Sequence, residues 1–109
     1  MRRPLRFLSH KLGLTSDQVA TLAEVLADLR TERAARDVEH QRAQKLYADA
    51  LKADTFDAEA AKRARDQVVA AHIAQQAAIT TALERLHAEL SADQRAQLSA
   101  ILRTDAFLF

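Results

Sequence analysis

Helix-breaking residues are almost absent from this chain. Its 109 residues include one glycine, Gly13, and one proline, Pro4, so neither type occurs after position 13. The tight turns of β-sheet proteins depend on these residue types. The sequence therefore predicts an all-α protein built from few, long helices. Alanine-rich helices bury little area each, so we also expect a thin subunit that self-associates into a homodimer.

Two copies of one short motif, LTSDQ and LSADQ, predict where helices begin. In each copy a hydroxyl residue, Thr15 or Ser91, is suited to be the N-cap of a helix. A glutamine, Gln18 or Gln94, follows at the third helical position and completes a capping box with that residue. One helix is therefore expected to start after Thr15 and another after Ser91.

A further break is expected where the sequence reads ADTFD, at residues 53–57. Asp57 is the expected N-cap of the helix that follows, and Phe56 is expected to pack back between the two long helices. Together the breaks divide a single domain, residues 1–109, into four helices. Their expected ranges are 1–13, 15–53, 58–89 and 91–104. The two long helices are expected to form an antiparallel hairpin, with a short helix at each end of the chain.

The predicted hairpin has apolar ends and a polar middle. The apolar seam of the first long helix, with residues three or four apart, reaches Leu29 and resumes near Tyr47. Between these points the seam passes through Arg36 and His40. Folding the helices back at the turn places His40 opposite the region of His72, so the polar stretches of the two helices coincide. This agreement favours the hairpin.

The composition limits the function. The formal net charge is +1, basic and acidic residues are interspersed, and there is no cysteine. Balanced charge is not typical of a nucleic-acid-binding protein, and no stretch approaches the ~20 apolar residues of a membrane span. No catalytic signature or phosphate-binding loop is present, so neither an enzyme nor a cofactor is expected. The N-terminus lacks the pattern of a signal peptide, which is expected of a cytosolic protein or a mature fragment.

The two boxes, the long hairpin and the ADTFD turn, in this order, resemble the Spy/CpxP family of bacterial envelope-stress proteins. Periplasmic metal-resistance proteins of the ZraP and CnrX kind share this architecture. The residues that carry the resemblance are Leu14, Thr15, Gln18, Asp54, Thr55, Phe56, Asp57, Leu90, Ser91 and Gln94. The resemblance implies a cradle-like antiparallel homodimer in the periplasm. It also implies either ATP-independent holding of unfolding proteins on a concave surface or metal sensing and scavenging.

A holding chaperone needs exposed apolar side chains next to charges that speed capture and keep the complex soluble. We expect the polar middle of the hairpin to form a basic wall and the ends of the chain to supply apolar pockets. The basic candidates are Arg33, Arg36, Arg42, Lys45 and Arg65. The apolar candidates are Phe7, Leu8, Ile101, Leu102, Phe107 and Phe109. The alternative for each apolar candidate is a place in the core or in the dimer contact.

A metal site is the second candidate, because His40 and His72 are expected to face one another across the hairpin. Two imidazoles within reach would form a loose site for a transition metal. The alternative is two ordinary histidines on a polar surface.

The leading functional prediction is an envelope holding chaperone that binds unfolded clients. A metal sensor or metal-resistance protein of the same fold and a structural helical adaptor with a fixed protein partner are the alternatives.

Overall fold

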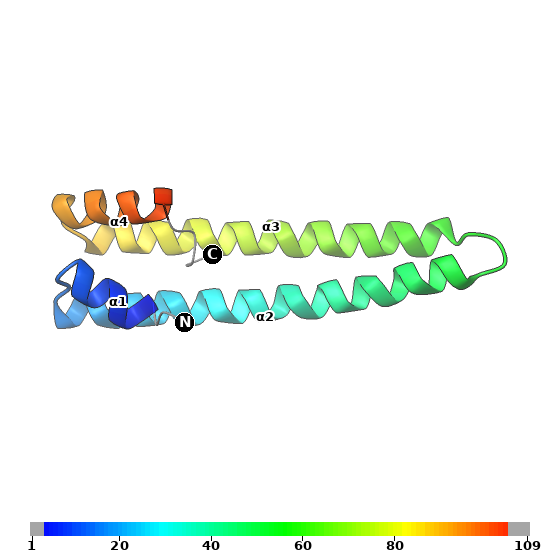
Figure 1. Cartoon of the computed structure of the whole chain (residues 1–109), viewed down its shortest axis with the longest axis horizontal. Helices are drawn as coiled ribbons and strands as arrows, with labels where there is room; N and C mark the ends of the chain where they lie inside the picture. The colour runs from blue at the N-terminus through cyan, green and yellow to red at the C-terminus, as the bar shows by residue number, and fades with distance from the viewer. Residues whose placement is uncertain (1–3, 105–109) are drawn as a thin grey trace. The chain divides into compact units, whose positions relative to one another are not determined.

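The computed structural model describes residues 4–104, and these residues form four α-helices and no strand (Figure 1). The helices are α1 (Pro4–Lys11), α2 (Ser16–Lys52), α3 (Ala58–Glu89) and α4 (Ala92–Thr104). The two long helices, α2 and α3, pack together as an antiparallel pair joined by a short turn. The prediction of an all-α fold with a long helical hairpin and two short terminal helices is confirmed.

Helix α1 ends in a Schellman motif centred on the only glycine. Gly13 has a φ of 61°, a left-handed conformation that residues with a Cβ adopt at a cost. Its N–H donates to the carbonyl of His10 (3.3 Å), and the N–H of Leu14 donates to the carbonyl of Ser9 (3.0 Å). These two bonds satisfy carbonyls that the end of α1 would otherwise leave without partners. The glycine thereby allows the chain to reverse sharply before α2.

The structure divides into two compact units. The terminal unit comprises Met1–Arg30 and Ile79–Phe109, and the central unit comprises Thr31–Ala78. The boundary between the units falls within α2 and within α3, so one part of each long helix belongs to the terminal unit and the other part to the central unit. Each unit has a different kind of core, and this difference determines where candidate binding surfaces occur.

The terminal unit has a core of large aliphatic side chains contributed by all four helices and the segments next to them. The buried members are Leu8, Leu12, Leu22, Val25, Leu26, Leu29, Ala82, Leu86, Leu90 and Leu98. At the edge of this core Arg85 of α3 binds two carboxylates of α2, Glu24 (2.6 Å) and Asp28 (3.3 Å). These ion pairs join α2 to α3 and agree with the predicted hairpin, in which the two long helices fold back on one another at the turn.

The central unit has a core of small side chains. Its buried apolar residues are Ala43, Ala50, Ala60 and Ala64. Alanine side chains allow two helices to approach closely, but they remove little apolar surface from water. The central unit therefore buries much less apolar area per residue than the terminal unit.

The turn between α2 and α3 corrects one prediction. The N–H of Ala60 donates to Asp57 Oδ1 (3.0 Å), so Asp57 caps α3. Phe56, however, is 59% exposed and does not lie between the helices. The physical reason is the alanine core: Ala50 and Ala60 are almost completely buried at this end of the hairpin, and such small side chains hold two helices too close together for a phenyl ring to fit between them. The prediction that Phe56 packs inward was wrong.

Candidate functional site

Both capping boxes are formed in the terminal unit. At the start of α2 the Gln18 N–H donates to Thr15 Oγ1 (3.3 Å), and the Thr15 N–H donates to Gln18 Oε1 (3.0 Å). At the start of α4 the Gln94 N–H donates to Ser91 Oγ (3.2 Å), and the Ser91 N–H donates to Gln94 Oε1 (2.9 Å). Each box thus satisfies two backbone donors that a helix N-terminus leaves unpaired.

The two box glutamines also bind one another, in an arrangement that we call the amide clasp. Gln18 Nε2 donates to Gln94 Oε1 (2.8 Å), and Gln94 Nε2 donates to Gln18 Oε1 (3.0 Å). The second hydrogen of each amide donates to a backbone carbonyl, that of Glu89 from Gln18 (2.8 Å) and that of Leu12 from Gln94 (3.3 Å). Every donor and acceptor of both amides is used. The clasp therefore joins the starts of α2 and α4 to the chain segments that precede them.

Sequence reasoning assigned each glutamine to its own box and missed the clasp. The available signal was that both boxes place the same residue type at the same helical position. A glutamine has two donors and two acceptor positions, whereas a capping box needs only one acceptor. The unused capacity of two equivalent amides at one end of a hairpin would have indicated that they meet.

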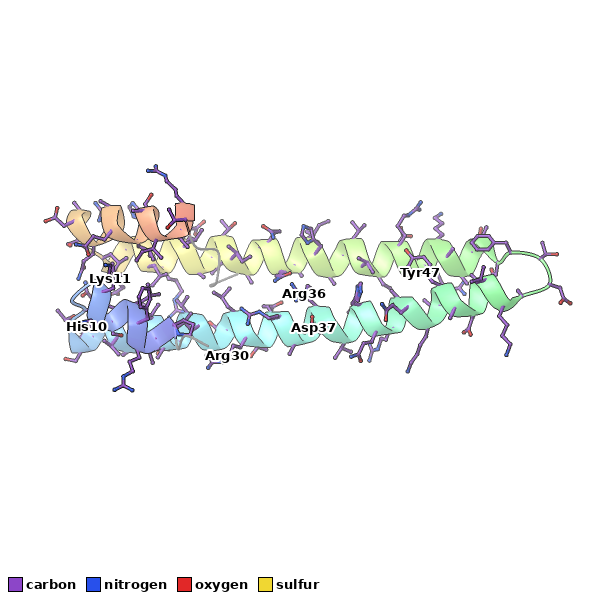
Figure 2. All side chains as sticks on the ribbon, in the orientation of Figure 1. His10, Lys11, Arg30, Arg36, Asp37 and Tyr47 are labelled. Atoms are coloured by element: carbon purple, nitrogen blue, oxygen red, sulfur yellow. The ribbon has the colours of Figure 1, made fainter. Side chains whose placement is uncertain are left out.

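In the central unit, Arg36 of α2 makes a polar contact with a buried side chain of α3. Gln75 is the buried polar residue of this unit, 7% exposed, and its Oε1 accepts from Arg36 Nη1 (3.2 Å). Arg36 Nη2 also donates to Asp37 Oδ1 (3.0 Å), and both residues lie midway along α2 (Figure 2). Arg36 is thus held between a buried amide and a neighbouring carboxylate.

Two of the other four basic candidates are paired with acidic neighbours on their own helix. Arg42 binds Glu39 (2.7 Å) and Arg65 binds Asp66 (3.5 Å). Lys45 is exposed, and Arg33 is partly buried. With Arg36 included, carboxylates accompany three of the five basic candidates, so the surface around those three has mixed charge.

The candidate metal residues His40 and His72 line one hollow of the central unit. This central hollow has a volume of about 250 Å³ and is lined by Arg36, Asp37, His40, Val68, Ala71 and His72. The hairpin therefore brings the two histidines to a common hollow. Within residues 4–104, however, no group of three or more histidine, cysteine, aspartate or glutamate side chains is arranged to hold a metal ion.

Large apolar side chains lie exposed on the central unit. We call them the exposed apolar set, and they are Val38, Tyr47, Leu51, Phe56, Val69 and Ile73. Leu51 is 79% exposed and Ile73 is 63% exposed, although both belong to helices that have a core to pack against. Tyr47 is labelled in Figure 2 and is 44% exposed, and Leu51 follows it by four residues on the same face of α2. Sequence reasoning did not include this set among the client-binding candidates.

Most of the predicted apolar pocket residues belong instead to the terminal core. Leu8 is completely buried, so its assignment to an accessible pocket is corrected. It is buried because α1 packs its one apolar stripe directly on the core. Phe7, Ile101 and Leu102 are partly buried and packed against the same cluster. The remaining two candidates, Phe107 and Phe109, lie outside the described residues.

The terminal unit also contains an apolar groove beside α4. This leucine groove has a volume of about 360 Å³. It is lined by Leu83, Leu86, His87, Leu90, Arg95, Leu98, Ser99, Leu102 and Arg103. Among the predicted candidates that lie within residues 4–104, Leu102 alone lines the groove. Leu83 also lines it and is 36% exposed.

The described helices give no indication of a membrane span, since none of those within residues 4–104 is both long and apolar enough to cross a bilayer. Neither the curated proteins nor the solved structures contain a significant match to the chain. A family model described as LTXXQ motif family protein matches residues 1–102, which include both capping boxes and the whole hairpin. On this match, and with both boxes formed at the helix starts, the chain belongs to the LTXXQ motif family.

Proposed function

We propose that the protein is an ATP-independent holding chaperone that binds unfolded or partly folded clients as part of an envelope stress response. Membership of the LTXXQ family suggests a periplasmic stress protein or metal-resistance protein. Within that pair of functions, the exposed apolar set supports holding. We further propose that the active form is a homodimer in the periplasm, as the resemblance to the Spy/CpxP family implies.

The single observation that carries this proposal is the exposure of six large apolar side chains on a unit whose own core consists of alanines. Burying a side chain of this size from water contributes about 1.5–3 kcal/mol. The central unit leaves that energy unused in the subunit, so it is available for binding another chain. The ion pairs next to the set, such as Arg42 with Glu39, keep such a surface soluble.

Members of the exposed apolar set lie on two different helices, so the residues on each helix can be mutated separately. The effect of each change on dimerisation can then be compared with its effect on client binding. Tyr47 and Leu51 lie four residues apart on α2, and Val69 and Ile73 lie four residues apart on α3. Residues with this spacing share a face of a helix. Each pair is therefore a natural unit for mutation.

The test uses two double variants, Tyr47→Ser/Leu51→Ser and Val69→Ser/Ile73→Ser. Suppression of the aggregation of unrelated unfolding proteins is measured at stoichiometric amounts without nucleotide, and sedimentation gives the mass of each variant. We expect at least one double variant to lose most of the suppression while its unfolding free energy stays within about 0.5 kcal/mol of the unchanged chain, because the residues are exposed. The matched control is Gln41→Ser/Gln44→Ser, which changes two exposed polar residues of α2.

The proposal fails if the unchanged chain suppresses no aggregation with several different clients. It also fails if both apolar double variants suppress aggregation as well as the control does. Loss of dimer mass in one variant together with full suppression by that variant would assign its residues to the dimer contact.

A metal-related function is the second candidate, and the shared position of His40 and His72 in the central hollow is the observation that favours it. Two imidazoles provide part of a site for zinc, copper, nickel or cobalt. Calorimetry with each ion tests this candidate. Micromolar binding that disappears in His40→Ala/His72→Ala supports the hollow as the site, and binding that survives this change places it elsewhere.

A further inference from the structure

We propose that the leucine groove of the terminal unit binds a short apolar peptide segment that carries acidic residues at its flank. The inference rests on the proposed function, since it names the kind of client segment that one surface of the protein selects. It concerns a different unit from the exposed apolar set, and it has a separate experimental readout.

The floor and walls of the groove fit apolar side chains. Leu86, Leu90 and Leu98 form a floor that is shared with the core and is 6–7% exposed. Leu83 of α3 and Leu102 of α4 stand at its sides and are more accessible. A hollow of about 360 Å³ falls within the range of binding pockets, roughly 300–1,000 Å³. Grooves between helices of this kind accept the apolar anchors of a peptide.

The groove is lined by basic side chains and, among the described lining residues, by no acidic one. Its polar lining residues are His87, Arg95, Ser99 and Arg103, of which the two arginines carry a positive charge. Neither arginine forms an ion pair with another residue of the described part of the chain. Within residues 4–104, the groove thus presents two guanidinium groups without a carboxylate partner beside an apolar floor.

Arg95 is held at the edge of the groove by the backbone. Its Nη1 donates to the carbonyl of Leu90 (2.8 Å), the last residue before the second capping box. A guanidinium has five N–H donors, and this contact uses one of them. Arg95 therefore provides a fixed cation with donors to spare, a geometry suited to binding a carboxylate.

The central hollow is a useful contrast. Its arginine, Arg36, binds Asp37 and the buried amide of Gln75, so its charge is already compensated. No preference for an acidic ligand is therefore expected at the central hollow. An apolar floor beside arginines that form no ion pair with another described residue occurs in the leucine groove and not in the central hollow.

The experiment measures the binding of three labelled peptides to the full chain by fluorescence anisotropy. All three are about ten residues long, with leucine and phenylalanine at alternate positions, and they carry two aspartates, two lysines or two serines at one end. We expect the aspartate peptide to bind most tightly and the lysine peptide least tightly. We also expect this order to weaken in 1 M salt, where charges are screened over about 3 Å.

The decisive variant is Arg103→Glu, with Lys62→Glu on α3 of the central unit as the matched charge reversal. An exposed ion pair is worth up to about 1 kcal/mol, and reversal replaces attraction by repulsion, so we expect about fivefold weaker binding of the aspartate peptide. The same variant should bind the lysine peptide more tightly. Lys62→Glu should leave the order of the three peptides unchanged, and circular dichroism confirms that both variants remain helical.

Equal binding of the three peptides to the unchanged chain would overturn the inference, as would an Arg103→Glu variant with the same order of preference as the control. Either result can accompany full suppression of client aggregation, and the proposed function would then stand without it. If the chain suppresses no aggregation, the proposed function fails, whatever the peptides show.

Discussion

The amide clasp yields a quantitative prediction, the destabilisation caused by Gln18→Ala. The change removes four hydrogen bonds: two with Gln94, one with the Thr15 N–H and one with the Glu89 carbonyl. The two bonds to Gln94 are partly buried, and each is worth about 1 kcal/mol. The other two are exposed, and water replaces them at about 0.5 kcal/mol each. The expected loss of unfolding free energy is therefore about 3 kcal/mol.

The double-mutant cycle tests the clasp more sharply than either single change. Gln94→Ala removes the same two shared bonds, together with those to the Ser91 N–H and the Leu12 carbonyl. Because the shared bonds can be lost only once, the double variant should be about 2 kcal/mol more stable than the sum of the two single changes predicts. Urea unfolding of the unchanged chain, the two single variants and the double variant, followed by circular dichroism, gives the unfolding free energies that the cycle compares.

Thr15→Ala is the control for this cycle, since it removes the N-cap hydroxyl and leaves the clasp in place. It should cost about 1 kcal/mol. Additive effects of Gln18→Ala and Gln94→Ala would refute the reasoning, because two amides that bind each other cannot act independently. A loss for Gln18→Ala no larger than that for Thr15→Ala would show that the cap alone carries the stability.

Three further predictions concern single contacts. Arg36→Ala should cost about 1–2 kcal/mol in urea unfolding, since it leaves the buried amide oxygen of Gln75 without this donor, while Arg42→Ala, which removes an exposed ion pair, should cost under about 0.5 kcal/mol. Gly13→Ala should lower the unfolding free energy by about 1 kcal/mol, because an alanine is strained at a φ of 61°. An added Cβ meets no atom within 4 Å there, so the expected cost comes from the backbone conformation alone. A melting temperature equal to that of the unchanged chain would contradict this backbone strain. Arg85→Ala should cost under about 1 kcal/mol at low salt and almost nothing in 1 M salt, because its two ion pairs are exposed; a loss that salt does not reduce would indicate a packing role.

Local signals were enough to predict the helices and their register. A capping box needs only four residues, and both boxes and the Asp57 cap are formed at the expected positions. The register followed from the position of the turn, and the contact of Arg36 with Gln75 agrees with it. These features depend on residues close in sequence or on a single reversal of the chain, which a sequence specifies directly.

Features that depend on a choice between adjacent residues were not predicted correctly. The apolar seam was expected to resume near Tyr47, but Tyr47 is 44% exposed, whereas its neighbour Leu46 is partly buried. A period of 3.6 residues fits either neighbour, so the pattern alone could not choose. The exposed apolar set escaped detection for the same reason, because an apolar residue in an amphipathic pattern is first assumed to be buried.

The clasp was missed for a different reason. Its two glutamines are separated by 76 positions, and their meeting depends on how α1 and α4 pack on the ends of the hairpin. No short-range pattern contains that information. The same holds for the leucine groove, which exists only once α4 lies beside the end of α3.

The alanine core of the central unit affects how uniquely α2 and α3 align with each other. Two smooth alanine surfaces have few protruding side chains to interlock, so sliding one helix along the other by a turn sacrifices little contact area. A buried polar pair penalises such sliding, because a shifted partner leaves an amide unsatisfied in the interior. The contact of Arg36 with Gln75 occupies this position in the central unit. The Arg36–Gln75 contact therefore favours the observed alignment of α2 with α3 over a shifted one, because a shift would take the Gln75 amide away from this partner.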